Sequence, residues 1–126
     1  MNTFPIRLQN FRWTEKDGTE HLWSVDMALA LIKTTGLKPE VEIDRELALD
    51  ALAKNDQANE LLPEHVERAV LDEPLIIVEH SYKGQRMHVI IDGWHRINKF
   101  VNRSTRMEPL MAYYLTEDEA KRIKLK

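Results

Sequence analysis

The chain has 126 residues, enough for one domain that buries a single core without disulfides or a metal. It contains no cysteine, which excludes disulfides, thiol catalysis and Cys-rich zinc sites and suits a reducing cytoplasm. Its net charge of −3 comes from interspersed acids and bases, so any contact with nucleic acid has to be local. No signal peptide and no run of membrane-spanning length is visible, so we expect a cytoplasmic protein of unknown oligomeric state.

The first part of the chain is typical of a β-hairpin. Residues 6–13 and 21–25 have the composition of two strands, and the turn signal at residues 16–19 separates them. Trp13 and Trp23 are expected to pack across the hairpin or into the core. The hairpin, within residues 1–25, is either appended to the domain or a flexible arm.

A helix is expected over residues 27–35, where apolar residues recur at helical spacing. Ser24 or Asp26 can cap its start, and Gly36 is suited to its end. A short strand over residues 41–43 follows.

Two further helices lead to the middle of the chain. Asp44 can cap a helix over residues 45–54, and a proline begins another over residues 63–71. The polar residues 55–59 connect the two. The side chains expected to face the core from all three helices are Met27, Ala28, Leu31, Ile32, Leu47, Leu49, Ala51, Leu52, Val66, Val70 and Leu71.

The second half of the chain carries the stronger strand signals. Residues 75–78 are a wholly apolar run, which is typical of a strand buried on both faces. Strands are also expected over residues 86–91 and 109–115, and Thr116 starts a capping box for a closing helix. The fold class is therefore predicted to be α+β, a small mixed sheet with packed helices and an N-terminal hairpin, in one domain over residues 1–126.

The stretch from residue 87 to residue 100 changes its period in the middle. It begins with the alternation of a strand, Gly93 interrupts the alternation, and the apolar spacing after it is helical. A strand that turns sharply into a helix leaves backbone N–H groups at the positive end of the helix dipole. Such a turn is suited to phosphate, and His95 and Arg96 lie where they can reach the same anion.

This pattern resembles the ParB/sulfiredoxin superfamily. Its members have an apolar strand after proline, a hairpin, a strand-Gly-x-x-Arg-helix element and a final strand. Here residues 75–78 follow Pro74, and Gly93-Trp94-His95-Arg96 fills the Gly-x-x-Arg element. The resemblance covers residues 75–115 clearly, and residues 65–74 also resemble a helix that precedes this core in small ParB-like proteins. Residues before Glu60 match only in the order of elements. It implies a ParB/sulfiredoxin-like fold with a nucleotide phosphate cradle at Gly93, Trp94, His95 and Arg96.

The family's branches differ in chemistry at this turn. Trp94 stands where sulfiredoxins have their reactive cysteine, so the resemblance does not imply a sulfiredoxin-type reductase. Chromosome-partitioning ParB proteins have Gly-Glu-Arg-Arg, bind CTP and carry a following helix-turn-helix domain, which is not expected here. Free serine kinases carry Asp-Gly-His-His-Arg, which is similar to residues 92–96 and implies ATP- or ADP-dependent phosphoryl transfer to a small hydroxyl compound.

Each residue of the turn has a second interpretation. Asp92 is a candidate Mg²⁺ ligand, orients His95, or caps the helix. Arg96 offers a planar fork to phosphate or pairs with Asp92 or Glu117, and it is not expected to be in the core. His95 donates to phosphate, shuttles a proton, or is simply exposed. Trp94 stacks on a base or packs under the turn.

A transferase would also need a base to accept the proton of the attacking hydroxyl. The candidate catalytic residues are Asp92, His95, Glu42 and Asp44. His65, His80 and His88 have no recognisable metal-ligand spacing. Lys99 and Arg103 extend a basic stripe from Arg96, which is either a nucleic-acid contact or a solvated helix face.

The sequence therefore predicts a nucleotide-phosphate-binding ParB-like domain, acting as a nucleotide-dependent switch. Its expected ligand is a nucleoside di- or triphosphate with Mg²⁺, and DNA is a further candidate partner through Lys99 and Arg103. One alternative is a nucleotide-dependent enzyme: an NTP hydrolase, a small-molecule kinase or a nuclease. Another is a degenerate domain that serves only as a protein-interaction module.

Overall fold

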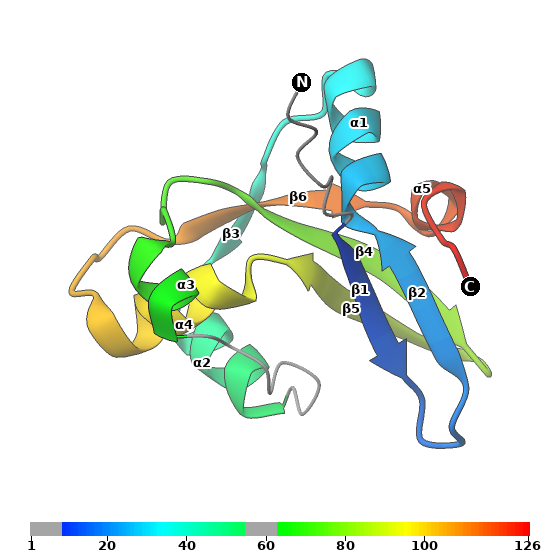
Figure 1. Cartoon of the computed structure of the whole chain (residues 1–126), viewed down its shortest axis with the longest axis horizontal. Coiled ribbons are helices and arrows are strands. Elements are labelled where there is room, and N and C mark those ends of the chain that lie inside the picture. The colour runs from blue at the N-terminus through cyan, green and yellow to red at the C-terminus, as the bar shows by residue number, and fades with distance from the viewer. Residues whose placement is uncertain (1–8, 55–62) are drawn as a thin grey trace, which may run out of the picture.

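The computed structural model describes residues 9–54 and 63–126 and confirms the α+β class. In these residues, five helices pack around a two-stranded and a four-stranded sheet (Figure 1). Two predicted features, the start of the first strand at residues 6–8 and the connector at residues 55–59, lie outside the described residues. None of the helices in the described ranges is long and apolar enough to cross a membrane.

The predicted N-terminal hairpin is present and belongs to the core of the domain. It comprises β1 (Asn10–Thr14) and β2 (Glu20–Ser24), paired antiparallel. The Trp23 side chain is only 1% exposed, and its backbone forms a bridge with Lys124 near the C-terminus. The expectation of a flexible arm is therefore wrong, because the hairpin supplies the largest fully buried side chain of the described residues.

The register of the hairpin decides which side chains face each other. Trp13 is opposite His21, and Phe11 is opposite Trp23. The two tryptophans are thus diagonal neighbours, and Trp13 packs half-buried against the core cluster that contains Trp23.

The main sheet has the strand order β3-β6-β4-β5. Its strands are β3 (Val41–Ile43), β4 (Leu75–Tyr82), β5 (Gln85–Asp92) and β6 (Leu110–Leu115). Neighbouring β4 and β6 run parallel, and the other two pairs are antiparallel. The apolar run at residues 75–78 lies inside the sheet and is fully buried or nearly so, as the sequence predicts.

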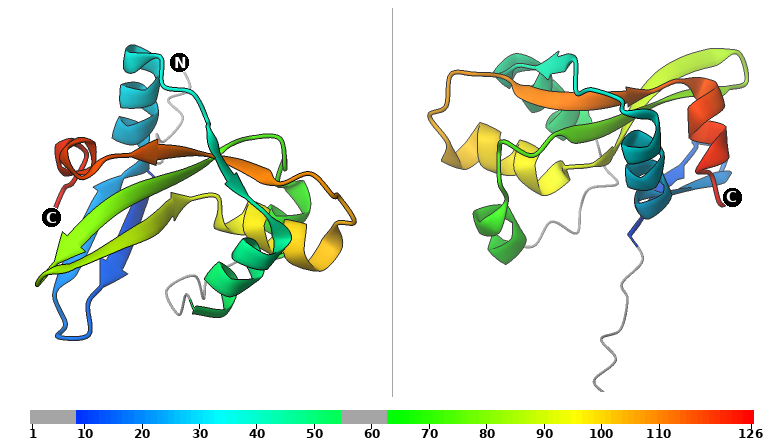
Figure 2. Two further views of the ribbon diagram at one scale, coloured as in Figure 1. Left: turned by 180° about the vertical axis from the view of Figure 1, so that it is seen from behind. Right: turned by 90° about the horizontal axis from the view of Figure 1, so that it is seen from above.

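Alternate residues of β4 face two separate hydrophobic clusters, as the period of a strand requires. On one face Ile76 packs in a cluster with Trp23, under the hairpin. On the other face Ile77 packs in a cluster with Phe100. The sheet is thus covered on both sides (Figure 2).

Two helices accompany the hairpin. α1 (Val25–Thr35) begins at Ser24, whose hydroxyl oxygen accepts the Met27 N–H, and ends at Gly36 in the left-handed conformation. α5 (Glu117–Arg122) begins with the predicted capping box of Thr116 and Glu119. Both starts agree with the sequence because capping depends on residues within one turn.

The other three helices gather at the opposite end of the sheet (Figure 1). They are α2 (Arg45–Lys54), α3 (Pro63–Arg68) and α4 (Trp94–Arg103), and both α2 and α3 pack on α4. The predicted cap of α2 is confirmed, since an Asp44 carboxylate oxygen accepts the Leu47 N–H.

Arg45 fixes the C-terminal end of α4 in place. Its guanidinium lies 4.5 Å from the centre of the Phe100 ring and donates to the carbonyl oxygens of Phe100, Val101, Ser104 and Arg106. These carbonyls at and beyond the helix end would otherwise lack partners, and a cation there also suits the helix dipole.

Several side chains predicted to face the core are exposed instead. Met27, Leu47, Leu49 and Val70 are 44–55% exposed. α2 packs mainly on α4 and β3 and fully buries only Ala48, so Leu47 and Leu49 remain at the surface while Leu52 packs half-buried against the core. α3 ends at Arg68, three residues earlier than predicted, which leaves Val70 in a loop.

Candidate functional site

The predicted strand-Gly-helix turn is confirmed, with Gly93 between the last residue of β5 and the first of α4. Gly93 has a φ of 110°, a conformation that side chains disfavour. A Cβ atom at this position would lie 2.2 Å from Cδ2 of Leu75, which is itself fully buried. Glycine is thus required twice, for the backbone conformation and for the close approach of β4.

A cavity of about 690 Å³ opens beside this turn. One wall is the start of α4 with Gly93, His95 and Arg96, and the facing wall is α3 with His65 and Arg68. Gly93 is the N-cap residue of α4, and no side chain caps the helix there. The cavity is therefore of ligand-binding size and lies at the positive end of a ten-residue helix.

Arg96 is held by protein groups at the edge of this cavity. One guanidinium nitrogen donates to the carbonyl oxygens of Glu73 at 3.0 Å and Pro74 at 2.5 Å. The other pairs with an Asp92 carboxylate oxygen at 3.0 Å. Arg96 ties α4 to the segment before β4, and with its side chain 12% exposed it lies at the edge of the core rather than among the buried residues, as the sequence predicts.

Asp92 faces the same cavity with its carboxylate paired to Arg96, and its side chain is 24% exposed. The interpretation of Asp92 as the helix cap is wrong, because Gly93 occupies the N-cap position. The predicted ion pair of Arg96 is formed with Asp92, four residues away. A role for Asp92 as a Mg²⁺ ligand stays a prediction.

His95 lies half-buried against His65, with ring centres 5.2 Å apart. Burial lowers the pKa of His95, and the neighbouring charges of His65 and Arg96 lower it further, while Asp92 opposes them. The neutral imidazole of His95, which can both accept and donate a proton, is therefore favoured at neutral pH.

Trp94 points away from this cavity. Its indole N–H donates to the Ile90 carbonyl oxygen at 2.8 Å, and its ring lines a separate apolar cavity of about 590 Å³ together with Glu42. Trp94 thus packs half-buried against the core beneath the turn, and its stacking on a base stays a prediction. The candidate bases Glu42 and Asp44 are not brought to His95, since Glu42 lines the apolar cavity and Asp44 caps α2.

The basic stripe along α4 is only partly exposed. The Lys99 ammonium donates to the carbonyl oxygens of Glu67 and Ala69, at the end of α3, at 2.9 and 2.8 Å. Arg103 is exposed to solvent. A nucleic-acid contact through Lys99 and Arg103 stays a prediction, but Lys99 has a structural role in joining α3 to α4.

The cavity wall includes residues that no motif in the sequence marks as parts of a site. His65 and Arg68 come from α3, and Glu73 from the loop that follows it. The helical pattern of residues 63–71 was the available signal, since one turn separates His65 from Arg68. The docking of α3 on α4 is a tertiary contact that no local pattern indicates.

Comparisons with known proteins add no relative, because no family model, no curated protein and no solved structure matches the chain. The ParB/sulfiredoxin-like resemblance accordingly rests on the residues of the Gly-x-x-Arg element and on the order of the elements around it.

Proposed function

We propose that the chain is a ParB/sulfiredoxin-like, cytoplasmic domain that binds the phosphates of a nucleoside di- or triphosphate at the first turn of α4. The observation that carries the proposal is the cavity of about 690 Å³ beside a helix start that no side chain caps. Backbone N–H groups in such a turn suit phosphate oxygens, and the helix dipole favours negative charge there.

The side chains that line the cavity have different roles in the proposed binding of phosphate. Arg68 is exposed and reaches the cavity from α3, so it is the cation best placed to form a new charge-assisted bond with phosphate. His65 and His95 add imidazole donors beside it. Arg96 mainly holds the turn in shape through Asp92 and two carbonyl oxygens.

A nucleotide hydrolase or phosphotransferase is the second candidate function. It is favoured by the presence of Glu73 and Asp92 in the wall of the same cavity, where carboxylates can hold Mg²⁺ or accept a proton. If the site is catalytic, Glu73→Gln should abolish phosphate release while leaving nucleotide affinity within a fewfold of wild type.

The test is calorimetric titration of the protein with ATP, ADP, CTP and GTP, with and without Mg²⁺. Arg68→Ala is the informative variant, because the side chain is exposed and its loss leaves the helix contacts intact. A bond between an ion and phosphate contributes about 1.5–3 kcal/mol, so affinity should fall by roughly tenfold to a hundredfold.

Arg103→Ala is the matched control, since it removes an exposed arginine at the far end of α4, two turns beyond Arg96. It should leave nucleotide affinity unchanged. The proposal fails if the wild type binds none of the four nucleotides at millimolar concentration, or if Arg68→Ala binds as tightly as the wild type. A protein-interaction module would then be the better hypothesis.

A further inference from the structure

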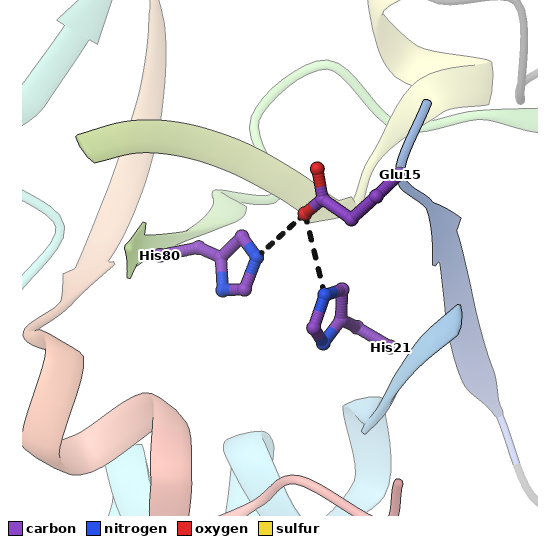
Figure 3. Close-up of side chains that lie close together, drawn as sticks. All are labelled: Glu15, His21 and His80. Atoms are coloured by element: carbon purple, nitrogen blue, oxygen red, sulfur yellow. Dashed lines mark hydrogen bonds and ion pairs between the residues drawn. The ribbon is translucent and has the colours of Figure 1, made fainter. Parts of the chain in front are cut away.

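Three ionisable side chains meet where the hairpin packs on the main sheet. Glu15 directly follows β1, His21 lies in β2 and His80 lies in β4, and their ring nitrogens and carboxylate converge (Figure 3). The side chains are 7–10% exposed, so the group is nearly enclosed. It shares no residue with the cavity at α4.

Both histidines approach the same oxygen of Glu15. His80 Nε2 lies 2.9 Å from Oε1, in a hydrogen bond, and His21 Nε2 lies 3.3 Å from the same atom. His21 Nε2 is buried and forms no hydrogen bond within the described residues. A buried nitrogen without a partner costs free energy unless another group satisfies it.

Aromatic neighbours hold the imidazole rings in position. The ring of His80 lies edge-on to Trp23 at 5.2 Å between centres, and His21 lies edge-on to Tyr82 at 5.2 Å. The two imidazoles themselves are 4.4 Å apart. Their nitrogens therefore point at Glu15 because packing restricts the rings, a form of preorganisation that a metal site needs.

The separations between donor atoms fit a small tetrahedral ion. Ligand bonds of about 2.0–2.2 Å, as Zn²⁺ forms with nitrogen and oxygen, place neighbouring ligand atoms about 3.3–3.5 Å apart. The contact of His21 with Glu15 is already 3.3 Å, and that of His80 has to lengthen by a few tenths of an ångström. All three donor atoms lie within 4.8 Å of one another.

We propose that Glu15, His21 and His80 form a zinc site that joins the N-terminal hairpin to β4. Two imidazole nitrogens and one carboxylate suit Zn²⁺, whereas Mg²⁺ and Ca²⁺ prefer oxygen ligands. A zinc ion gives His21 Nε2 the partner that it lacks and replaces the proton in the hydrogen bond between His80 Nε2 and Glu15. His21 and His80 also line a neighbouring cavity of about 130 Å³, which has room for a water molecule as a fourth ligand.

Lys124 opposes the bound ion. Its ammonium lines the small cavity near Trp23, and its positive charge acts on His21. A cation beside a metal site weakens metal affinity by like-charge repulsion. Replacing Lys124 by glutamine should therefore tighten zinc binding by roughly two- to fivefold, the size expected of a charge close to the protein surface.

The hairpin does not depend on the proposed site for its position. Near the cluster, Asp17 accepts a hydrogen bond from the Tyr82 hydroxyl at 2.7 Å and pairs with Lys83 at 2.7 Å. Trp23 also anchors β2 in the core. Variants of the three proposed ligands should consequently keep the fold, which circular dichroism and a urea unfolding curve can verify.

The experiment titrates metal-free full-length protein with Zn²⁺ in the presence of a competing chromophoric chelator. The wild type should bind one equivalent, Mg²⁺ should not compete, and Co²⁺ should give the absorption of a tetrahedral complex. Glu15→Gln and His80→Ala should each lower zinc affinity by roughly a hundredfold or more, since even outer-shell changes cost tenfold to a hundredfold. Glu15→Gln retains the shape and a hydrogen-bond acceptor.

His65→Ala is the matched control, because His65 and His95 form the other histidine pair in the described part of the chain. It should bind zinc like the wild type. The proposal is overturned if the wild type shows no binding at micromolar zinc, if Glu15→Gln binds equally well, or if His65→Ala alone removes the binding. Each of these results would leave the cluster as a hydrogen-bonded link between hairpin and sheet.

Discussion

The first turn of α4 presents its polar groups to an open cavity, whereas Glu15, His21 and His80 turn theirs toward one another. The turn is built from four consecutive residues, and its cavity is roughly five times larger than the one beside the cluster. The cluster instead collects side chains from three segments, and Glu15 and His80 are 65 positions apart in the sequence. The first arrangement suits a molecule with phosphate groups, and the second suits a single ion.

The two regions also differ in how their charged groups are paired and in how much space they leave for a ligand. At the turn, Arg96 and Asp92 neutralise each other and leave Arg68 exposed for a ligand. In the cluster one carboxylate faces two imidazoles, and no larger ligand has room. The cluster is thus enclosed and restricted to a small ligand, whereas the open cavity at the turn has room for a larger one.

The largest expected effect comes from filling the space at Gly93. Gly93→Ala would place a Cβ atom against Leu75 and force a side chain into a positive φ. Backbone strain of about 1–3 kcal/mol and overpacking of a similar size should together lower the free energy of unfolding by about 2–6 kcal/mol. Urea unfolding measures this change.

Gly84→Ala is the matched control for that variant. Gly84 also has a positive φ, 82°, but nothing lies within 4 Å of its Cβ position. It should cost only about 1–2 kcal/mol, the conformational part alone. If both variants lose the same stability, the close approach of Leu75 does not restrict the turn, and the turn is less constrained than its geometry indicates.

A smaller effect is expected from Arg96→Ala. The substitution leaves the carbonyls of Glu73 and Pro74 and the carboxylate of Asp92 without their donor, so the free energy of unfolding should fall by about 2–3 kcal/mol. Arg103→Ala, at an exposed position of the same helix, should stay within about 0.5 kcal/mol of the wild type. Equal stabilities of the two variants would contradict a structural role for Arg96.

Local patterns in the sequence predicted most elements and their ends. The caps at Ser24, Asp44 and Thr116 and the turn at Gly93 depend on neighbours within a few residues, so they are visible in the sequence. The positions of the elements relative to one another are not visible in the sequence. Helical periodicity predicts that both Ile32 in α1 and Leu49 in α2 face the core. The prediction is correct for Ile32 but wrong for Leu49, because α2 packs on its neighbours along a narrow face.

The sites show the same limit. The sequence indicated the α4 turn because its residues are consecutive, but not Arg68, which reaches the cavity only through the docking of α3. The spacing of His80 from the other histidines has no metal-ligand signature, and neither Glu15 nor His21 lies near His80 in the sequence. Their meeting depends on the hairpin folding over β4, a contact that has no signature in spacing along the chain.

The smallest expected effect concerns the protonation of His95. Its pKa should lie below the ordinary value of 6.5, because burial and the positive charges nearby disfavour the imidazolium. Titration of the imidazole resonances by NMR measures this value directly. His65→Ala removes one of the repelling charges and part of the burial, so it should move the pKa of His95 upward, toward 6.5.

The same shift predicts how stability depends on pH. Below 6.5 the unfolded chain binds a proton at His95 more readily than the folded protein does, so the free energy of unfolding falls as pH decreases through the folded pKa. Above 6.5 both states are neutral at this residue, and the contribution no longer changes. In His95→Gln the decrease between neutral and mildly acidic pH should be smaller than in the wild type, while His88→Ala, at an exposed position of β5, should preserve it. A wild-type His95 with a pKa at or above 6.5 would contradict this prediction. It would show that the imidazole at the α4 turn is as well solvated as a histidine in a surface loop.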